Sequence, residues 1–490
     1  MRAYLRSMRI RRTNSFVSLL SFSVKAYKST RSNKFMSSGI IHLNHAGASP
    51  GPDTVLERVR QYTELEQLIG GYAAAATVAS QLNTVYQDVA NLIHAKSSSS
   101  SSSVDEIALV ESATVAWTRL FYSLADYQER NRALREHQTK VIWISEVEYA
   151  ANVVAACHWA RTHDHWTVRR IPSVQRPDGG STGVVDVDEF RRMLHGDDDD
   201  DGANESSKLV PALVCITHIP TNSGIVNPAQ EIGSIISSYN ERQSNRRCQS
   251  DPPSLFYLLD ACQSVGQIDV NVKEIQCHGM AATGRKYLRG PRGTGFLYIS
   301  ESIVEHIFPH HLDHFGVPVT RVPASRDLVS QPHAPLEHSI DFAPRRGAQR
   351  FEFWESNIAN RLGLGEAIRH ANKIGIENIS SRIKRLATGL YEKLLSIEGV
   401  RCHHVPSNGG RAANCGLVTF WIKGFESSAV KNQLDKLGFA TSVVPATSTP
   451  LDSAIASVPD LVRVSVSYTN TMDEIELFCT KLSGIIRELR

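Results

Sequence analysis

The chain has 490 residues, of which 41% are hydrophobic, so it is long enough to bury a large core and to form roughly two or three domains. Its formal net charge is only +3, and basic and acidic residues are mixed along most of the chain, so the composition does not support a nucleic-acid-binding surface. The eight cysteines form no CxxC pair and show no zinc-ligand spacing with histidine. We therefore expect reduced thiols and no metal site.

Residues 1–38 do not have the composition of folded protein. They are rich in Arg, Lys and Ser, and the first acidic residue of the chain is Asp53. This composition is typical of an organelle transit peptide, so we predict a leader that directs the protein to the mitochondrion. A disordered basic tail, or translation that starts at Met36, would instead indicate a cytoplasmic protein. No apolar run is long enough to span a bilayer, and we expect no membrane partner.

After the leader, short apolar runs alternate with segments of helical periodicity. Strands are predicted at residues 106–112, 140–149, 209–220 and 255–260, and helices at 114–127, 150–163 and 229–241. Strands that alternate with helices pair in parallel, which predicts an α/β fold whose mainly parallel sheet is covered by helices on both faces. In such sheets, ligands bind where the strands end.

From about residue 357 the pattern changes from alternation to consecutive helices. Helical segments at 358–375 and 379–397 precede apolar strands at 414–422 and 461–468. We therefore divide the chain into the leader at 1–38, a large domain with an N-terminal arm at 39–350, and a C-terminal part at 351–490. The last part should contain linking helices and a smaller α+β domain.

Side chains that can take part in chemistry follow several of the predicted strands. Ser112 and Thr114 end one strand and begin a helix, whose free N–H groups favour a phosphate. At the ends of other strands, Tyr149 offers an aromatic ring, Asp260 a carboxylate and Lys286 an amine. These are the parts needed to hold pyridoxal phosphate. Taken singly, each has an ordinary structural explanation, such as a helix cap or core packing, so the prediction rests on their combination.

Each part has a chemical reason. Lys286 must act as a neutral amine that forms a Schiff base with the cofactor aldehyde and later carries a proton. Asp260 would keep the pyridine nitrogen protonated, so that the ring can withdraw electrons from the substrate's α-carbon. Gln263 could hydrogen-bond the phenolic oxygen of the ring, and Thr283 could bind the phosphate. Arg463 could grip a substrate carboxylate bidentately, which a lysine would do less well.

Two segments, "DACQSVGQIDVNV" (260–272) and "TGRKYLRGPRGTGFLY" (283–298), resemble the aminotransferase class V family of fold-type I pyridoxal-phosphate enzymes. The resemblance runs from "LNHAGASP" to the C-terminal strand and covers nearly all of the chain after the leader. It implies the fold of that family, an amino-acid substrate, and a homodimer whose sites lie at the subunit interface. "FEFWESNIANRLGLGEAI" looks closest to the branch that contains isopenicillin N epimerase-like proteins and the carbon–sulfur lyases of ergothioneine synthesis.

The resemblance also implies roles for single residues. Lys286 would be the catalytic, cofactor-bound lysine. Three positions depart from better-known members: Tyr149 stands where desulfurases have a stacked histidine, Arg285 where many relatives have histidine, and Thr221 where many have a ring-contacting asparagine. The predicted cofactor-binding set is Ser112, Ala113, Thr114, Tyr149, Thr221, Asn222, Asp260, Gln263, Thr283, Arg285 and Lys286, with Asn44 and Arg463 predicted to bind the substrate.

The fate of the α-carbanion separates the candidate reactions. We predict a carbon–sulfur lyase that expels a sulfur group from the β-carbon of a cysteine-derived amino acid. The alternatives are an aminotransferase or epimerase of the same family, and a non-catalytic scaffold, against which intact Lys286 and Asp260 argue. A cysteine desulfurase is disfavoured because residues 438–461, where such relatives carry a nucleophilic thiol, contain no cysteine. We expect Cys415 in a core strand, and Cys262 to face away from Asp260.

Overall fold

The computed structural model describes residues 39–95, 105–130, 138–177, 179–196, 209–244, 252–322, 337, 340–403, 413–455, 458 and 460–489. The predicted leader at 1–38 lies outside the described residues. Residues 42–490 form one compact unit. Of the other unit, residues 1–41, the structure describes residues 39–41 alone.

The secondary structure follows the predicted alternation of strands and helices. The strands are β1 (Ile41–His42), β2 (Ile107–Val110), β3 (Thr139–Ser145), β4 (Trp166–Ile171), β5 (Ser173–Gln175), β6 (Ser181–Val185), β7 (Leu209–Thr217), β8 (Phe256–Asp260), β9 (Gly279–Thr283), β10 (Gly295–Ile299), β11 (Val319–Arg321), β12 (Asp341–Phe342), β13 (Val400–Cys402), β14 (Leu417–Ile422), β15 (Phe439–Ala440), β16 (Ser442–Val444) and β17 (Leu461–Ser465). The helices are α2 (Asp53–Ile69), α3 (Gly71–Thr77), α4 (Ala79–Leu92), α5 (Ala113–Arg130), α6 (Ala150–Thr162), α7 (Val187–Gly196), α8 (Ala229–Ser244), α9 (Val272–Ile275), α10 (Glu301–Val304), α12 (Ile358–Ile374), α13 (Ile376–Leu395), α14 (Ser427–Lys436) and α15 (Met472–Leu489), with short 3-10 turns η3 (Ala348–Phe351) and η4 (Ala446–Ser448).

The central sheet of the described chain has seven strands in the order β2-β10-β9-β8-β7-β3-β4. Strands β9, β8, β7, β3 and β4 pair in parallel, whereas β10 runs antiparallel to both of its neighbours, β9 and β2. Strand β2 therefore runs in the same direction as β9. The predicted α/β class with a mainly parallel sheet is confirmed, and the carboxyl ends of these strands meet at one edge.

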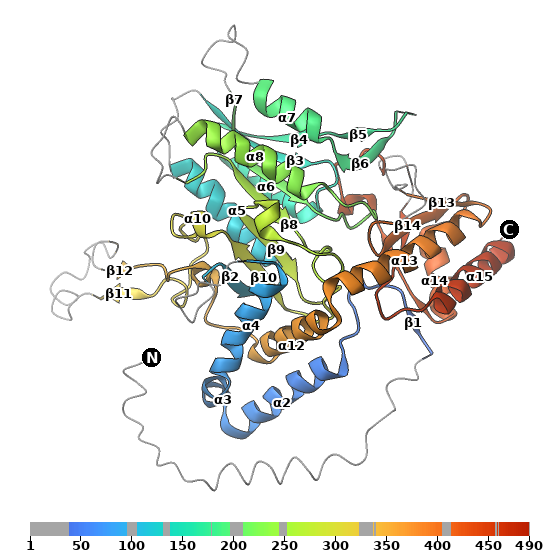
Figure 1. Ribbon diagram of the computed structural model, residues 1–490, viewed down its shortest axis with the longest axis horizontal. Helices are drawn as coiled ribbons and strands as arrows, with labels where there is room; N and C mark the ends of the chain where they lie inside the picture. The colour runs from blue at the N-terminus through green and yellow to red at the C-terminus, as the bar shows by residue number, and fades with distance from the viewer. Residues whose placement is uncertain are drawn as a thin grey trace. The chain divides into compact units, whose positions relative to one another are not determined.

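Helices cover both faces of the sheet (Figure 1). On one face, α5 and α6 pack through Trp117, Phe121 and Trp159 against apolar strand residues. On the other face, α4, α7, α8 and α12 pack against the alternate residues of the same strands. Every residue of β8 and β9 is buried, which explains why these strands are apolar runs without polar alternation.

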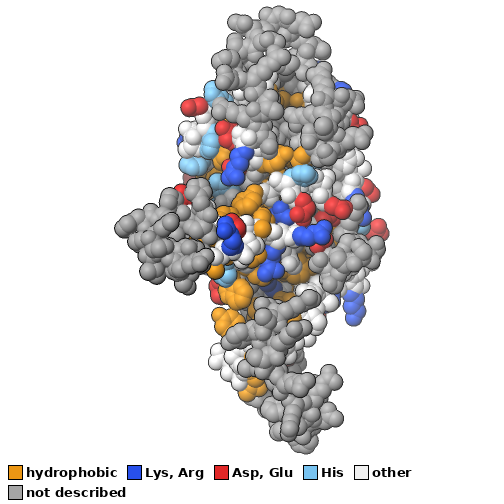
Figure 2. Space-filling model, turned by 90° about the vertical axis from the view of Figure 1, so that its left-hand side faces the viewer, with side chains coloured by type: hydrophobic (Ala, Val, Ile, Leu, Met, Phe, Trp, Pro, Cys, Tyr) orange, Lys and Arg blue, Asp and Glu red, His pale blue; other side chains and the backbone are white. Residues whose placement is uncertain are grey.

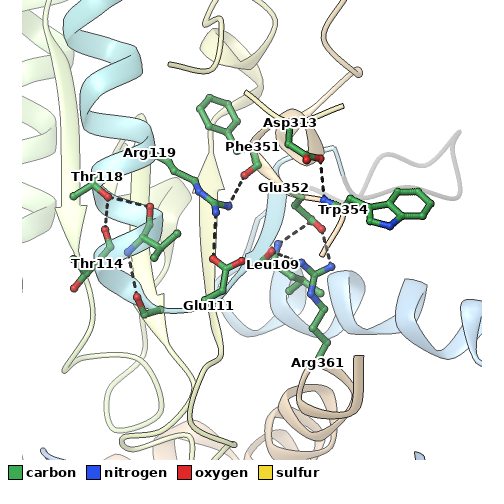
Figure 3. Close-up of polar contacts among 12 residues, drawn as sticks. Leu109, Glu111, Thr114, Thr118, Arg119, Asp313, Phe351, Glu352, Trp354 and Arg361 are labelled. Carbon is green, nitrogen blue, oxygen red and sulfur yellow. Dashed lines mark hydrogen bonds and ion pairs between the residues drawn. The ribbon is translucent and has the colours of Figure 1, made fainter. Parts of the chain in front are cut away.

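The outer side of the edge strand β2 meets a buried ion pair (Figure 3). The carboxylate of Glu352, which is fully buried, accepts hydrogen bonds from the backbone N–H of Leu109 at 2.9 Å and from the Tyr86 hydroxyl at 2.8 Å. The guanidinium of Arg361 donates to the Leu109 carbonyl and to Glu352, both at 2.9 Å. The two side chains thus occupy the backbone groups of Leu109 that an added strand would use, which protects this edge from pairing.

The C-terminal part of the chain contains a second, antiparallel sheet in the order β13-β14-β17-β16, with α13, α14 and α15 packed beside it. The predicted helices and strands of this part are present as α12, α13, β14 and β17. The N-terminal segment joins this sheet, because the N–H of Ser465 donates to the carbonyl of Leu43 at 2.8 Å. The proposed domain boundary near residue 350 stays a prediction.

The remaining features of the described chain are its membrane-spanning potential, its cysteines and its surface charge. No helix within the described ranges is long and apolar enough to cross a membrane. The cysteines for which the structure gives a position are free thiols. On the face drawn in Figure 2, basic and acidic side chains are mixed, and hydrophobic side chains reach the surface between them.

Candidate active site

A pocket lies at the carboxyl ends of the central strands. It is lined by Ser112, Ala113, Thr114, Tyr149, Asn152, Thr217, Thr221, Asp260, Cys262, Gln263, Thr283, Arg285 and Lys286. All predicted cofactor-binding residues except Asn222 are in this lining. The fold thus brings together residues that follow β2, β3, β7, β8 and β9. The contact that each would make with a cofactor stays a prediction.

A tight turn after β9 holds Lys286. Gly284 begins this turn, and a Cβ atom at this position would lie 2.3 Å from Thr294 Oγ1 and 2.8 Å from Leu364 Cδ1. A side chain at position 284 would therefore displace its neighbours, so glycine is required for the close approach. The side chain of Lys286 itself is buried, with 8% of its surface exposed.

The surroundings of Lys286 favour its neutral form. Burial is the largest effect and lowers the pKa of the amine, and the nearby charges of Arg285 and Arg463 lower it further. Cys262 and Asp260 act in the opposite direction, but the net pKa is lowered. A neutral amine is the form that can attack a carbonyl carbon or accept a proton from carbon.

Asp260 ends β8 and carries a buried carboxylate into the pocket lining. Its Oδ1 accepts a hydrogen bond from the N–H of Cys262 at 2.9 Å, and its Oδ2 accepts one from Asn152 Nδ2 at 3.0 Å. Burial raises the pKa of this carboxyl, while the two hydrogen bonds and the charge of Lys286 lower it. A cationic partner in the pocket, such as a protonated ring nitrogen, would stabilise the ionised carboxylate.

The first turn of α5 forms another part of the pocket. Ser112 Oγ accepts a hydrogen bond from the N–H of Val115 at 3.2 Å and so caps the helix. Ala113 and Thr114 follow in the lining. The N–H groups of a helix's first turn have no partners inside the helix, and the dipole of this 18-residue helix adds partial positive charge there. This end of the pocket therefore suits a phosphate.

Gln263 retains hydrogen-bonding capacity for a ligand. Its Nε2 donates to the carbonyl of Ala46 at 3.2 Å and to Thr221 Oγ1 at 3.4 Å. Its Oε1 is buried and has no hydrogen-bond partner within the described chain. A buried amide oxygen without a partner is costly, so a ligand that satisfied it would stabilise this position.

Arg463 and Asn44 lie next to the pocket rather than in its lining. The NH1 group of Arg463, on β17, donates to Thr221 Oγ1 at 2.8 Å, and its NH2 group donates to Asn44 Oδ1 at 3.4 Å. Burial lowers the pKa of Arg463 to about 10, which still leaves it cationic near neutral pH. Its Nε is buried without a partner among the described residues. This guanidinium can therefore still donate to a carboxylate.

The remaining predicted residues of the lining come from three segments. Tyr149 precedes α6 and is 39% exposed, which is compatible with a ring that faces a ligand. Thr283 is buried and donates its hydroxyl hydrogen to the carbonyl of Thr294 at 3.1 Å. Arg285 donates to the carbonyl of Gly47. The predicted stacking of Tyr149 and the predicted phosphate contacts of Thr283 and Arg285 stay predictions.

Two expectations of the sequence differ from the structure. Asn222 lies outside the lining, and its Nδ2 donates to the Pro445 carbonyl and to Thr449 Oγ1, both at 3.0 Å, so it joins the β7 end to the segment after β16. The expectation that Cys262 faces away from Asp260 was wrong, because Cys262 lines the same pocket and its thiol lies beside the Lys286 amine. Burial raises the pKa of this thiol, whereas the lysine lowers it.

Sequence reasoning missed two polar residues of the lining, Asn152 and Thr217. Asn152 lies in the first turn of α6, and Thr217 is the last residue of β7. Thr217 could have been found from its place at a strand end, the same signal that identified Asp260. Asn152 gives no such signal, because its contact with Asp260 joins residues 108 positions apart in the sequence.

Pyridoxal phosphate fits the residues of this pocket. The N-terminus of α5 provides free donors for the phosphate, Asp260 provides a buried anion for the ring nitrogen, and Lys286 provides a buried amine for the aldehyde. Among the described residues, no group of three or more His, Cys, Asp or Glu side chains is arranged to hold a metal ion. The fold and the pocket together define a fold-type I pyridoxal-phosphate enzyme.

Comparison with known proteins gives the family. The aminotransferase class-V family matches residues 41–478, and the chain belongs to that family. A protein from Methanothermobacter thermautotrophicus named "Probable cysteine desulfurase" is 26% identical over 454 residues, which cover 91% of this chain and 94% of that protein. A cysteine desulfurase from Serratia proteamaculans is 24% identical over 454 residues, covering 91% of this chain and 93% of the relative.

Solved structures share the fold. The apo structure of a cysteine desulfurase from Thermococcus onnurineus NA1 superposes with a TM-score of 0.71 at 19% identity, and the match covers 92% of this chain and 95% of the other. The cystine carbon–sulfur lyase C-DES, in complex with its product cysteine persulfide, gives a TM-score of 0.66 at 19% identity over 91% of this chain and 98% of its own. At these identities the likeness concerns the fold alone.

Proposed function

We propose that this pyridoxal-phosphate enzyme is a carbon–sulfur lyase that acts on a cysteine-derived amino acid. In the proposed reaction, a β-thio-substituted amino acid and water yield a thiol, pyruvate and ammonium. The observation that carries the proposal is the placement of buried Lys286 and Asp260 in one pocket, together with the lack of cysteine in residues 438–461. The relatives are named as a cysteine desulfurase and a cystine carbon–sulfur lyase, and these names support a sulfur-containing amino acid as the substrate.

Different side chains of the site would transfer the proton and bind the substrate carboxylate. When bound, pyridoxal phosphate supplies an aldehyde carbon and a ring that withdraws electrons from the substrate's α-carbon. The lowered pKa of Lys286 suits it to accept the α-proton through Nζ and to return a proton to the leaving sulfur. The unpartnered Nε of Arg463 suits this side chain to hold the substrate carboxylate. Asn44 accepts a hydrogen bond from the same guanidinium and would orient it.

A cysteine desulfurase is the second candidate function. The relatives carry this name, and Cys262 places a thiol in the pocket lining beside Lys286. In that reaction the Cys262 sulfur would attack the sulfur of cysteine while the carbon–sulfur bond of cysteine breaks, and protonation of the β-carbon would leave alanine and a protein persulfide. The thiol must first lose its proton, and the raised pKa of buried Cys262 opposes this step. For this reason we place the lyase first.

Product analysis separates these reactions. The purified protein is incubated with cysteine, cystine, cysteine S-conjugates and their sulfoxides, and pyruvate, ammonium, released thiol and alanine are measured. The lyase gives pyruvate and ammonium in equal amounts and little protein-bound persulfide. Alanine together with a stoichiometric persulfide on Cys262 would favour the desulfurase. Transfer of the amino group to a keto acid would favour an aminotransferase, and inversion of the α-carbon without loss of sulfur an epimerase.

Paired cysteine variants sharpen the test. Cys262→Ala removes the thiol of the pocket. Cys415→Ala removes a fully buried thiol that donates a hydrogen bond to the carbonyl of Gly224. If the lyase proposal is correct, both variants keep most of the turnover. If Cys262→Ala abolishes turnover while Cys415→Ala retains it, the desulfurase replaces the lyase.

A further inference from the structure

A second buried carboxyl group lies one side chain away from Asp260. Glu148 follows β3, precedes α6 and is fully buried, and it is not part of the pocket lining. The reaction proposed above gives it no task. A fully buried ionisable group without a structural partner of opposite charge is unusual, because burial disfavours its charge.

Among the described residues, Glu148 accepts four hydrogen bonds. Its Oε2 accepts from Ser145 Oγ and from the N–H of Thr217, both at 2.9 Å. Its Oε1 accepts from Thr217 Oγ1 at 2.6 Å and from Asn152 Nδ2 at 2.8 Å. A carboxylate has acceptor sites for all of these donors, so these hydrogen bonds favour the ionised form and oppose the effect of burial.

Asn152 connects this group to the pocket. Its Nδ2 donates to Glu148 Oε1 at 2.8 Å and also to Asp260 Oδ2 at 3.0 Å. An amide nitrogen carries two hydrogens, so these two contacts use both of them and fix the orientation of the amide. The oxygen of Asp260 that faces Asn152 is therefore positioned by an amide nitrogen whose second hydrogen is bound by Glu148.

We propose that Glu148 is a positioning residue of the cofactor site, acting through Asn152 on the Asp260 carboxylate. The proposal rests on the pyridoxal-phosphate site and not on the identity of the sulfur substrate. Glu148 fixes the amide that orients Asp260, and it places a second negative charge near the position of the ring nitrogen. Both effects strengthen the hold of the pocket on a protonated ring.

The groups that face Glu148 support an electrostatic role. Three of them are titratable: Asp260 at the end of β8, Cys215 on β7 and Tyr257 on β8. Burial is the main cause that raises the pKa of each, and the charge of Glu148 adds to the effect on Cys215 and Tyr257. None of the three carries a positive charge. A cationic ring against Asp260 would therefore be the counter-charge for the pair of carboxylates.

A double-mutant cycle tests the connection. Cofactor-free Glu148→Gln, Asn152→Ala and the double variant are titrated at pH 8 with pyridoxal 5′-phosphate, and binding is followed by quenching of tryptophan fluorescence. Each single variant should bind the cofactor about ten- to a hundredfold more weakly, as expected when a hydrogen bond to a charged group is lost. The loss in the double variant should be smaller than the product of the two single losses, because part of the effect of Glu148 passes through Asn152. If the fold-loss of affinity in the double variant equals the product of the two single fold-losses, the two residues act independently and the proposal is overturned.

A matched control separates positioning from stability. Glu352→Gln alters another fully buried carboxylate, which accepts hydrogen bonds from Leu109, Tyr86 and Arg361 outside the pocket. This variant should lose stability but keep cofactor affinity within about twofold. If Glu148→Gln also loses stability but not affinity, Glu148 has a structural role only and the proposal fails.

A spectroscopic measurement completes the test. The pH at which the visible absorbance of the bound cofactor changes should shift in Glu148→Gln and stay unchanged in Glu352→Gln. If Glu148→Gln does not fold, Ser145→Ala, which removes one donor to Glu148 and lies outside the pocket lining, is measured in its place with weakening in the same direction expected. No substrate is used, so a wrong substrate class leaves the result intact. Failure of the wild-type protein to bind the cofactor would overturn the cofactor site itself.

Discussion

The buried Glu148 predicts how the stability of the cofactor-free protein depends on pH. Burial raises the pKa of its carboxyl from 4.5 to about 7, although hydrogen bonds from Thr217, Asn152 and Ser145 act in the opposite direction. A carboxyl whose pKa is higher in the folded than in the unfolded chain binds its proton more tightly when folded. Its contribution to stability is therefore complete below about pH 4.5 and is lost as the pH rises through about 7.

The magnitude follows from the size of the shift. One pKa unit corresponds to about 1.4 kcal/mol, so raising the pKa from 4.5 to about 7 gives a total change of about 3 kcal/mol in the free energy of unfolding. Most of this change, about 2 to 3 kcal/mol, falls between about pH 5 and pH 8. Glu148→Gln has a similar shape and does not titrate, so it lacks this pH dependence.

Urea unfolding of the cofactor-free proteins, followed by tryptophan fluorescence, measures the effect. The wild-type protein should lose about 2 to 3 kcal/mol relative to Glu148→Gln when the pH is raised from 5 to 8. Ser145→Ala removes one donor to the carboxylate and should make the loss larger. If the difference between wild type and Glu148→Gln changes by less than about 0.5 kcal/mol over this range, burial does not dominate this carboxyl and the reasoning is refuted.

Four further predictions concern other parts of the molecule. Lys286→Ala should lose the visible absorbance of the lysine-bound cofactor and all turnover, and normal turnover would contradict its role. Arg361→Met leaves Glu352 buried without its cation and should lower the free energy of unfolding by about 3 kcal/mol, measured with urea; a change below about 1 kcal/mol would refute the edge-strand argument. Sedimentation should show a homodimer, as inferred from the family, whereas an active monomer would contradict it. Residues 1–38 fused to a fluorescent protein should direct it to the mitochondrion, and diffuse cytosolic fluorescence would refute the leader.

Four strands of the central sheet, β2, β3, β7 and β8, could be predicted because they are short runs of buried apolar residues. A strand such as β8 then becomes a short apolar run that ends at a polar residue, and the strand end identifies Asp260 without any structure. The edge strand β4 escaped prediction because its middle residues, Arg169 and Arg170, are not buried, so it has no continuous apolar run. A short strand that is buried only at its two ends has neither an apolar run nor a regular alternation to recognise.

The orientation of Cys262 shows where local reasoning failed. Asp260 and Cys262 are two residues apart, a spacing that places side chains on the same side of an extended chain. The hydrogen bond from the N–H of Cys262 to Asp260 Oδ1 then holds both residues in the turn that borders the pocket. Cys262 lies in a turn beyond the end of β8, where the alternation of strand side chains no longer holds, so the direction of its thiol could not be predicted from the strand.

The contacts that could not be predicted join distant segments. Leu109 and Glu352 are 243 positions apart, and Asn152 and Asp260 are 108 apart. A buried carboxylate has no sequence pattern of its own, since Glu on a surface helix and Glu in a polar network look alike in a single sequence. Only the folded chain shows that Glu352 closes a sheet edge and that Glu148 reaches the active site.

Burial acts on the charged groups of the pocket in a way that favours one kind of ligand. It lowers the pKa of Lys286 and raises those of Asp260 and Glu148, so each group is driven towards its neutral form. A ligand with a cationic ring against Asp260 would favour ionised carboxylates, whereas burial, helped by the charges of Arg285 and Arg463, lowers the pKa of the lysine amine. The pocket therefore combines an amine of lowered pKa with a site for a cationic ring. Pyridoxal phosphate chemistry needs both conditions at the same time.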